Sequence, residues 1–254
     1  MPLLTDKTAI RAILCRDPAW GVYALGDLAP RMFPKTQWFA PGLGPDLALV
    51  LHDFDTSILF AIGTGAVREA LEHVRWPVHL QVQQDALDEA AQYAVIDKPC
   101  QMWRMSWNGP ATAGQHMERS RAVRLGPADV PALLRLYADG EATGESPDFF
   151  YPSMVTAGVF FGVYDGDALV AAAGTHLFAP EERAVAIGNI YTRRDCRGRG
   201  LGAAVTRAVL DVVKDSGTIG LNVRAHNHAA LRLYESLGFV RHCSFYEGLA
   251  TVRK

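Results

Sequence analysis

Several features that would assign a protein to a specialised class are missing from this sequence. Its longest apolar stretches, such as ALVAAAG, are far shorter than the roughly 20 residues that a membrane-spanning helix needs. The opening stretch, MPLLTDKTAIRAIL, carries charged residues early and lacks the uninterrupted apolar core of a signal peptide. We therefore expect a cytoplasmic protein with no membrane partner.

The sequence also lacks the residue spacings that mark disulfide frameworks and metal sites. The four cysteines, Cys15, Cys100, Cys196 and Cys243, are isolated, and the eight histidines are scattered. We expect neither a disulfide nor a bound metal ion. Positive charge is not in excess either, because 25 Lys and Arg face 27 Asp and Glu. Nucleic acid is therefore not an expected partner.

The composition is that of an ordinary globular protein of one or two domains. Hydrophobic residues make up 49% of the 254 residues and charged residues 20%. The stretch WNGPATAGQHMERS, residues 107–120, replaces periodic apolar patterns with small residues, Gly and Pro. It predicts an N-terminal domain over residues 1–110, a linker over 111–118 and a second domain over 119–254.

The second half alternates strand and helix patterns. Asp129 is a suitable N-cap for a helix reaching Tyr137, Asp165-Gly166 predicts a hairpin turn, and Gly217 suits the end of a helix that starts near Leu201. The acidic and aromatic segment 139–154 is typical either of a short helix or lid over a pocket, or of a solvated loop. The further expected elements are strands over 121–125, 158–178 (as a hairpin), 183–192, 218–225 and 239–249, and a helix over 227–238.

The first half shows a similar but weaker order of patterns. The expected sequence is strand 46–53, strand 57–63, helix 66–74, strand 77–83, helix 86–94 and strand 100–107. The passage from a strand into GTGAVREAL echoes residues 190–205, without their arginines. This echo suggests a degenerate internal repeat.

The most informative local motif is TRRDCRGRGLGAAV, residues 192–205. A strand ending at Thr192, a glycine-rich turn and a helix from Leu201 leave first-turn N–H groups without intrahelical acceptors, and these attract an anion. Glycines at 198, 200 and 202 allow its close approach, and the arginines at 193, 194, 197 and 199 give a local charge of +3 against Asp195. The alternative is a solvated basic turn.

Other phosphate-binding loops do not match this motif. The G-K-[ST] ending of nucleoside triphosphatase loops is missing, and so is the G-x-G-x-x-G of dinucleotide enzymes, because Ala203, Ala204 and Val205 follow Gly202. The turn also follows a hairpin, whereas a dinucleotide fold opens with its βαβ unit.

A second motif, NHAALRLYESLGF at residues 227–239, indicates which phosphate compound the loop would bind. It resembles the closing motif of the GCN5-related N-acetyltransferase (GNAT) superfamily, and RGRGLG resembles the superfamily's acyl-CoA pyrophosphate loop. The resemblance covers roughly residues 120–254. It implies an α/β (α+β) fold with a central mixed, mostly antiparallel sheet flanked by helices, preceded by a diverged N-terminal domain that can itself be GNAT-like.

The stretch GNIYTRRDCRGRGLG resembles the FR47-like branch of the superfamily, which includes glycine N-acyltransferase-like proteins. Those proteins pair a diverged N-terminal half with an active C-terminal half. The resemblance implies acetyl-CoA or another acyl-CoA as co-substrate, and a small-molecule amine or amino acid as acceptor. It is also compatible with a homodimer.

The resemblance assigns expected roles to matching residues. Tyr234 would be the general acid that protonates the departing CoA thiolate. Asn227 would contact the cofactor near its pantetheine arm and also cap its helix. The other expected cofactor-binding residues are Ile190, Tyr191 and Thr192 beside the pantetheine, and Arg197, Gly198, Arg199, Gly200, Leu201 and Gly202 around the pyrophosphate.

One departure from the family concerns the general base. Many members carry a glutamate on the strand before the loop, where this chain has Gly188-Asn189, and Asn189 cannot accept a proton at neutral pH. The candidates that replace it are Glu141, Glu145, His176 and ordered water. The sequence thus predicts an N-acyltransferase working by direct attack of the amine, with a non-catalytic acyl-CoA-binding or sensing protein as the alternative.

Overall fold

The computed structural model of the chain describes residues 3–42, 44–53, 55–110, 122–147 and 149–253. It divides into two compact units. Unit 1 comprises Met1–Arg104, Asn222–His226 and Arg241–Lys254; unit 2 comprises Met105–Leu221 and Asn227–Val240. The linker expected at residues 111–118 lies outside the described residues, and a domain division there stays a prediction.

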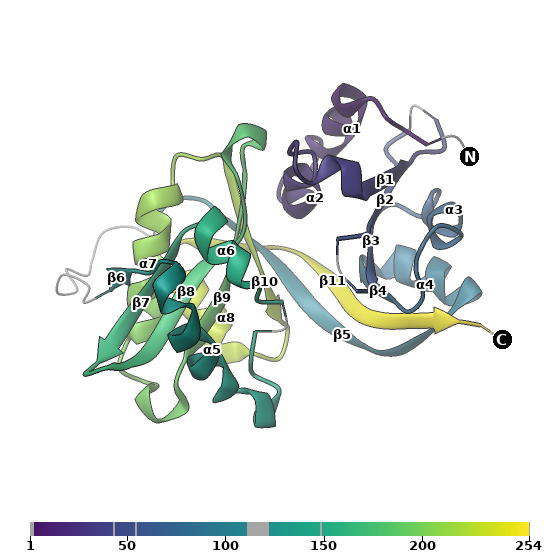
Figure 1. Cartoon of the computed structure of the whole chain (residues 1–254). Coiled ribbons are helices and arrows are strands. Elements are labelled where there is room, and N and C mark those ends of the chain that lie inside the picture. Colours follow the sequence, from purple (N-terminus) through teal and green to yellow (C-terminus); the bar gives the residue numbers. More distant parts are fainter. Residues whose placement is uncertain (1–2, 43, 54, 111–121, 148, 254) are drawn as a thin grey trace. The chain divides into compact units, whose positions relative to one another are not determined.

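The first part of the chain, which dominates unit 1, forms the strands and helices expected from residue 46 onwards, and three earlier elements, α1, α2 and β1, that the sequence analysis did not predict (Figure 1). They are α1 (Lys7–Leu14), α2 (Val22–Gly26), β1 (Thr36–Phe39), β2 (Leu47–Leu51), β3 (Ser57–Ile62), α3 (Val67–Leu71), β4 (Val78–Val82), α4 (Gln84–Tyr93) and β5 (Ala94–Trp107).

The sheet of unit 1 includes a strand from the far end of the sequence. Its hydrogen-bonded order is β1-β2-β3-β4-β11-β5, where β11 (Phe239–Val252) follows all other elements in the chain. β11 runs antiparallel to β4, with Tyr246 opposite Val82 and Ala250 opposite Val78. Figure 1 shows β11 lying along β5 in this unit. The last strand of the chain is therefore an inner strand of unit 1.

The core of unit 1 follows from its sequence patterns. All five residues of β2, LALVL, are buried, whereas β4, VHLQV, alternates between buried and half-buried residues. The buried faces of α3 and α4 pack with these strands in one hydrophobic cluster that includes Val67, Leu71 and Leu87. Burial of this apolar surface is the main force that holds the unit together.

The second part of the chain, which dominates unit 2, completes the element list. Its elements are β6 (Val123–Arg124), α5 (Val130–Ala138), α6 (Pro152–Ala157), β7 (Phe160–Asp165), β8 (Ala168–Ala179), β9 (Ala184–Thr192), α7 (Leu201–Val213), β10 (Thr218–Arg224) and α8 (His228–Ser236).

The two units repeat the same strand topology. In unit 2 the order is β10-β9-β8-β7-β6, in which β7, β8 and β9 are antiparallel and β9 is joined through α7 to the parallel β10. In unit 1 the antiparallel β1, β2 and β3 are joined through α3 to the parallel β4. The mixed, mostly antiparallel sheet flanked by helices matches the predicted fold class.

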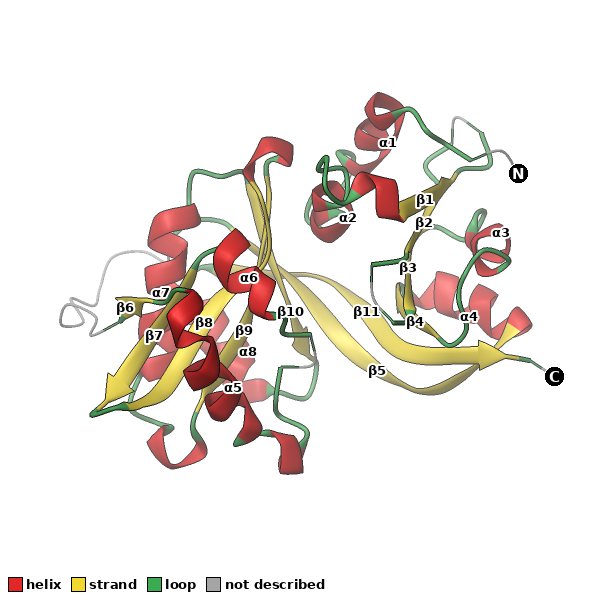
Figure 2. Ribbon diagram, viewed as in Figure 1, coloured by secondary structure: helices red, strands yellow, loops and turns green. Residues whose placement is uncertain are grey.

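Helices cover both faces of the unit 2 sheet (Figure 2). On one face, Leu133, Leu136 and Tyr137 of α5 pack with Phe160 of β7 and Tyr191 of β9. On the other face, α7 packs against β7, β8 and β9. The buried residues of α7 lie on one side of the helix, because Val205, Val209 and Val213 recur every four residues and Thr206 and Leu210 lie next to them.

Three local predictions differ from the structure wholly or in part. Gly217 does not end α7, which stops at Val213; its φ of +118° instead serves the turn before β10. Asp129 is the N-cap residue of α5 as predicted, but its carboxylate makes no capping hydrogen bond to that helix and accepts instead from the Gly126 N–H and the Tyr164 hydroxyl. The β7–β8 turn is Gly166-Asp167, one residue later than predicted.

Over the described residues, none of the helices combines the length and apolar character that crossing a membrane requires.

A buried carboxyl group in unit 1 is held in its protonated form. Asp27 follows α2 and is only 6% exposed. Burial, with a smaller contribution from the charge of Asp53, raises the pKa of Asp27 from 3.8 to about 8. The folded chain therefore binds a proton that the unfolded chain releases above pH 4. The stability associated with this group is fully present below pH 4 and is lost as the pH rises towards 8.

We predict that Asp27→Asn raises the free energy of unfolding by about 1 to 3 kcal/mol at pH 8, because the amide needs no proton to stay neutral. The gain should shrink towards zero near pH 4. Thermal unfolding at pH 4, 6 and 8 measures this difference. Replacement of the exposed Asp97 by Asn is the control and should change stability little at any pH. A gain for Asp27→Asn that is equal at all three pH values would contradict the prediction.

Candidate active site

The strand β9 loses one of its two neighbours halfway along its length. It pairs with β8 from Ala184 to Thr192, but its parallel pairing with β10 covers Ala184 to Ala186 alone. In the described chain, residues 187–192 therefore have no register with β10. The predicted residues Ile190, Tyr191 and Thr192 lie on this segment. An open strand edge of this kind offers backbone donors and acceptors to an extended ligand.

A bulge accompanies this divergence. Opposite β8, the register shifts by one residue between the pairs Ala172–Tyr191 and Gly174–Gly188, and Asn189 within the shift has a φ of +53°. Such a bulge increases the local twist of a strand and turns it away from a neighbour.

The side of the bulge facing α5 is fixed by a buried hydrogen bond. The Tyr137 hydroxyl donates to the Asn189 carbonyl oxygen at 2.8 Å, and burial raises the pKa of Tyr137 well above its usual value. The Asn189 side chain is 6% exposed and donates weakly to Met154 Sδ at 3.6 Å. Within the described chain, Asn189 Oδ1 has no hydrogen-bond partner. It is a buried acceptor on the open part of β9.

The glycine-rich loop follows β9 as the sequence predicts. Gly198 and Gly200 have φ values of +75° and +74°, which glycine adopts without strain. The helix α7 starts at Leu201, and the Ala204 N–H donates to the Gly200 carbonyl at 3.1 Å. The N–H groups of the residues before Ala204 have no acceptor within the helix. The loop thus presents exposed backbone donors at the positive end of the helix dipole.

Gly202 brings three elements together. A Cβ atom built on Gly202 would lie 3.3 Å from Leu233 Cδ1 of α8 and 3.3 Å from Thr192 Oγ1 of β9. A larger residue would therefore press on both neighbours. Because Gly202 has no side chain, the start of α7 can approach the end of β9 and the middle of α8 closely.

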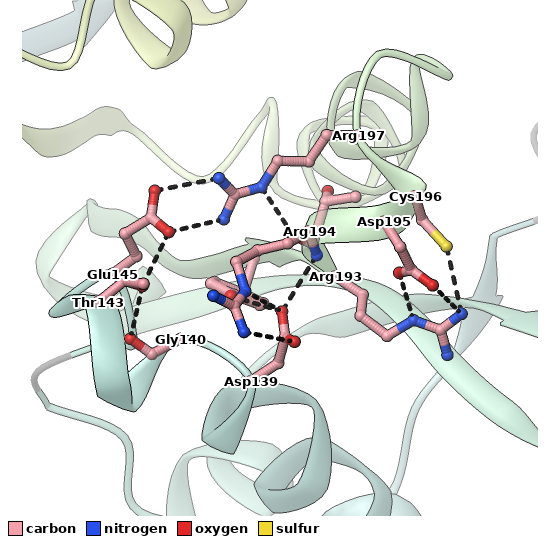
Figure 3. A network of polar contacts seen from close by, with 11 residues as sticks. Asp139, Gly140, Thr143, Glu145, Arg193, Arg194, Asp195, Cys196 and Arg197 are labelled. Carbon is pink, nitrogen blue, oxygen red and sulfur yellow. Dashed lines mark hydrogen bonds and ion pairs between the residues drawn. The ribbon is translucent and has the colours of Figure 1, made fainter.

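The four arginines of the loop are less available than the sequence predicts, and Figure 3 shows the contacts of three of them, Arg193, Arg194 and Arg197. Arg197 makes a two-pronged ion pair with Glu145, at 3.0 and 3.2 Å, and its Nε donates to the Thr192 carbonyl at 3.3 Å. Arg194 donates its backbone N–H to Asp139 at 3.0 Å, and its guanidinium group approaches the same carboxylate at 3.4 Å.

The other two arginines also face carboxylates. Arg193 binds Asp195 at 2.6 and 3.0 Å, and Arg199 lies 3.8 Å from Asp165. The local charge of +3 counted along the sequence is thus compensated by acidic residues from other elements. In the described structure, the guanidinium groups of the loop are therefore already paired with carboxylates.

The acidic segment after α5 is tied to the loop through two of these pairs. Asp139 accepts from the Tyr191 hydroxyl at 2.9 Å as well as from Arg194, and these hydrogen bonds lower its pKa. Arg197 and the Thr143 hydroxyl likewise lower the pKa of Glu145. The segment contains a short turn, Glu141–Thr143, and leads into the helix α6.

The sequence analysis did not identify Tyr137 and Asp139 as residues that position β9. Neither belongs to a motif, and each makes its hydrogen bond to a residue more than 50 positions away in the chain.

The helix α8 carries the remaining two predicted residues. Asn227 caps it as predicted, since its side-chain oxygen accepts from the Ala230 N–H at 3.1 Å. Tyr234 is 8% exposed, and its ring centroid lies 6.1 Å from that of Phe239. Its neighbour Leu233 is the side chain that limits space at Gly202. The structure thus brings β9, the loop and α8 together.

The three residues considered as general base have different surroundings. Glu145 is engaged by Arg197, which stabilises its charged form and makes it a poor base. Glu141 is exposed on its turn. His176 lies beside the β9 bulge. A Cβ atom built on Gly188 would be 2.9 Å from His176 Cβ, and the centroids of the His176 and Phe149 rings are 6.4 Å apart.

Among the described residues, no group of three or more His, Cys, Asp or Glu is arranged to hold a metal ion.

Comparison with known proteins points to one family. Residues 131–239 match the model of the acetyltransferase (GNAT) family. A mycothiol acetyltransferase from Renibacterium salmoninarum is 37% identical over 90 residues, which are 34% of this chain and 27% of that protein. The match therefore spans about a quarter of this relative's length.

Two solved structures share the fold over nearly the whole chain. A protein from Drosophila has a TM-score of 0.70 and 14% identity, covering 99% of this chain and 98% of its own. A GCN5-related N-acetyltransferase from Kribbella flavida has a TM-score of 0.58 and 16% identity, covering 97% and 96%. The family match is confined to residues 131–239, and the two solved structures show that the chain shares their fold.

Proposed function

We propose that the chain is an acyl-CoA-dependent N-acyltransferase, most simply an acetyltransferase, that acts on the primary amine of a small molecule or amino acid. The observation that carries this proposal is the open edge of β9, which leads directly into a glycine-rich loop at the start of α7. An extended arm can pair with such an edge while its phosphate end meets the helix N-terminus. Acyl-CoA has this combination of parts.

The residues present fit such a molecule. The backbone groups of Ile190 and Thr192 would bind the pantetheine arm, with Tyr191 between them and Asn227 near the same arm. The backbone N–H groups from Gly198 to Gly202 would hold the pyrophosphate, assisted by Arg197 and Arg199. The positive φ angles of Gly198 and Gly200 support this role, since they turn successive N–H groups outward.

The bound acyl-CoA supplies a thioester that an amine can attack. Nitrogen bonds to the carbonyl carbon, the carbon–sulfur bond then breaks, and the amide product forms without a covalent enzyme intermediate. Tyr234 would give its phenolic proton to the sulfur as it leaves. The amine must lose a proton as well, and Glu141, His176 and ordered water are the groups that suit this step better than the ion-paired Glu145.

Asn189 would orient the attacking amine. Its Oδ1 is a buried acceptor without a partner in the described chain, on the segment of β9 that has no register with β10. An amine N–H directed at Oδ1 would satisfy this acceptor, whose isolation is otherwise costly. Asn189 would be a positioning residue here, because an amide cannot accept the proton.

We also propose that unit 1 derives from a second GNAT-like domain without a phosphate loop of its own. The β3–α3–β4 crossover repeats the topology of β9–α7–β10, but the turn before α3 reads GTGA and carries no arginine. The resemblance to the FR47-like branch, in which a diverged half precedes an active one, agrees with this arrangement and stays a prediction.

One observation favours the alternative of a non-catalytic acyl-CoA-binding protein. Asn189 stands where many family members carry their glutamate base. Retention of Tyr234 in the matching helix supports the enzyme instead, because binding alone does not need a proton donor at that position.

The release of CoA thiol from acetyl-CoA, measured across a panel of amines and amino acids, tests the proposed reaction. We expect turnover with at least one acceptor, and a fall in kcat of about 100-fold or more for Tyr234→Phe with little change in the KM for acetyl-CoA. Tyr246→Phe, at a half-buried tyrosine on β11, is the control and should keep wild-type turnover. Tight CoA binding without turnover on any acceptor would establish the non-catalytic alternative.

A comparison of Gly200→Glu with Gly200→Gln tests whether the glycine-rich loop binds the pyrophosphate. Both variants place a side chain at a φ of +74°, so they share the same backbone strain and nearly the same bulk. The glutamate alone adds negative charge where the pyrophosphate would bind. We predict at least a tenfold weaker CoA affinity for Glu than for Gln in a titration, with equal circular dichroism spectra. Equal CoA affinities of the two variants would show that the loop is not part of the CoA-binding site.

The ion pair between Arg197 and Glu145 predicts a variant with tighter, and not weaker, CoA binding. A pyrophosphate that engages Arg197 must compete with Glu145, so Glu145→Gln should tighten CoA binding by about two- to fivefold, the range expected for an exposed ion pair. The exposed Glu141, replaced by Gln, is the matched control and should leave affinity unchanged. Weaker binding in Glu145→Gln would mean that the acidic segment supports the ligand and does not compete with it.

A further inference from the structure

Two bulges of opposite sense lie next to each other in the pairing of β8 and β9. The first adds a residue to β9 near Asn189, and the second, directly before the pair Leu177–Ala186, leaves His176 of β8 as the extra residue. A bulge of this kind redirects the side chain of the extra residue. The register of the two strands is thereby restored, and His176 lies beside the point where β9 leaves β10.

The His176 ring lies against Gly188. A Cβ atom built on Gly188 would be 2.9 Å from His176 Cβ and 3.3 Å from its Nδ1, so the imidazole uses the space that a side chain at position 188 would need. His176 and Gly188 are both half-buried, whereas Thr175, Ile187 and Asn189 beside them are buried. The imidazole is therefore accessible to a small molecule at the open part of β9.

The contacts of His176 and Asn189 place both side chains on the same face of the strand pair. The ring of Phe149, in the segment that leads into α6, has its centroid 6.4 Å from that of His176. The Asn189 side chain donates weakly to Met154 Sδ of α6 at 3.6 Å. This face is the one on which α6 packs against β8.

His176 differs in chemistry from the other ionisable side chains of this face. The sequences of β8 (ALVAAAGTHLFA), β9 (AVAIGNIYT) and α6 (PSMVTA) contain no Asp, Glu, Lys or Arg. Tyr191 of β9 donates its hydroxyl to Asp139 at 2.9 Å, and α5, which packs on the same strands, adds Arg135 and Tyr137. Of the ionisable groups on these four elements, only an imidazole readily accepts and releases a proton near neutral pH.

The two carboxylates considered for the same role are less suited to it. Hydrogen bonds from Arg197 and Thr143 lower the pKa of Glu145, which weakens that carboxylate as a proton acceptor. Glu141 is exposed on its turn. A carboxylate is ordinarily about 2 pKa units less basic than an imidazole, and the efficiency of a general base falls as its pKa drops below the working pH.

We propose that His176 is the general base of the acyl transfer, an inference that rests on the proposed function. The uncharged imidazole accepts the proton that the amine nitrogen must lose when it bonds to the thioester carbon. The carbon–sulfur bond breaks, and the sulfur takes the Tyr234 proton. Solvent then carries a proton from His176 back to Tyr234. The net reaction moves one proton from nitrogen to sulfur and returns both side chains to their initial states.

The test compares His176→Gln with the wild type, using the acceptor of highest turnover in the amine panel. Glutamine keeps hydrogen-bonding groups but cannot accept a proton. We expect kcat to fall by about 100-fold at pH 8, with the KM for acetyl-CoA and the circular dichroism spectrum unchanged. Below about pH 6.5, log(kcat/KM) should fall with a slope of about two in the wild type, where imidazole and amine are both protonated, and of about one in the variant.

Added imidazole gives a readout that a purely structural role would not change. It should raise the kcat of His176→Ala by about tenfold and leave that of His176→Gln unchanged, because glutamine fills the space. His73→Gln is the matched control. His73 of unit 1 is exposed and also lies against a phenylalanine ring, with its centroid 4.9 Å from that of Phe39. This control should keep wild-type turnover and the wild-type pH profile.

Three results would overturn the assignment of His176. They are a kcat of His176→Gln within about threefold of the wild type, equal slopes in the two pH profiles, and a larger loss in Glu141→Gln than in His176→Gln. If neither His176 variant folds, the wild-type profile decides, since a slope of about one below pH 6.5 means that the amine alone titrates.

Failure of the proposed function gives a different result. A wild type that turns over no acceptor overturns both the acyl transfer and the role of His176. Turnover that His176→Gln leaves undisturbed overturns the role of His176 alone.

Discussion

The divergence of β9 from β10 is the constraint on which the candidate site depends. The two strands are paired through only three residues of each, and the bulge at Asn189 then turns β9 away while its pairing with β8 continues. A strand edge that is opened in this way must be protected or occupied, because unpaired backbone groups are costly when buried. The Tyr137 hydroxyl satisfies one of them by donating to the Asn189 carbonyl. The glycine-rich loop, the start of α7 and the side of α8 are all arranged around the end of this edge.

Electrostatics at the loop are set by tertiary contacts more than by local sequence. Arg193 and Arg199 meet Asp195 and Asp165, and the two arginines most relevant to a ligand meet Asp139 and Glu145 of the acidic segment. These pairs are largely exposed, so each contributes little to stability. Their effect is on geometry, because they hold the acidic segment against the loop and fix the directions of the guanidinium groups. An anionic ligand would rearrange these pairs at low cost.

Much of this architecture could be predicted from the sequence, and the failures have a common cause. The strand and helix patterns, the cap at Asn227 and the strand–loop–helix order around Gly200 depend on neighbouring residues, and the structure agrees with them. The partners of Arg197 and Arg194 lie more than 50 residues away, so counting charge along the chain overestimates the local field. Arg104 is a second example, since nothing in CQMWRMSW indicates that this arginine would be buried among aromatic rings.

The place of β11 in unit 1 also bears on how the chain acquires its structure. Because β11 hydrogen-bonds between β4 and β5, unit 1 lacks an inner strand until residues 239–252 have been synthesised. During translation, the facing edges of β4 and β5 stay unpaired while all of unit 2 is being made. Exposed strand edges of this kind are where wrong strand partners attach, including those of a second copy of the chain. Synthesis of β11 is thus the event that completes the sheet of the first unit.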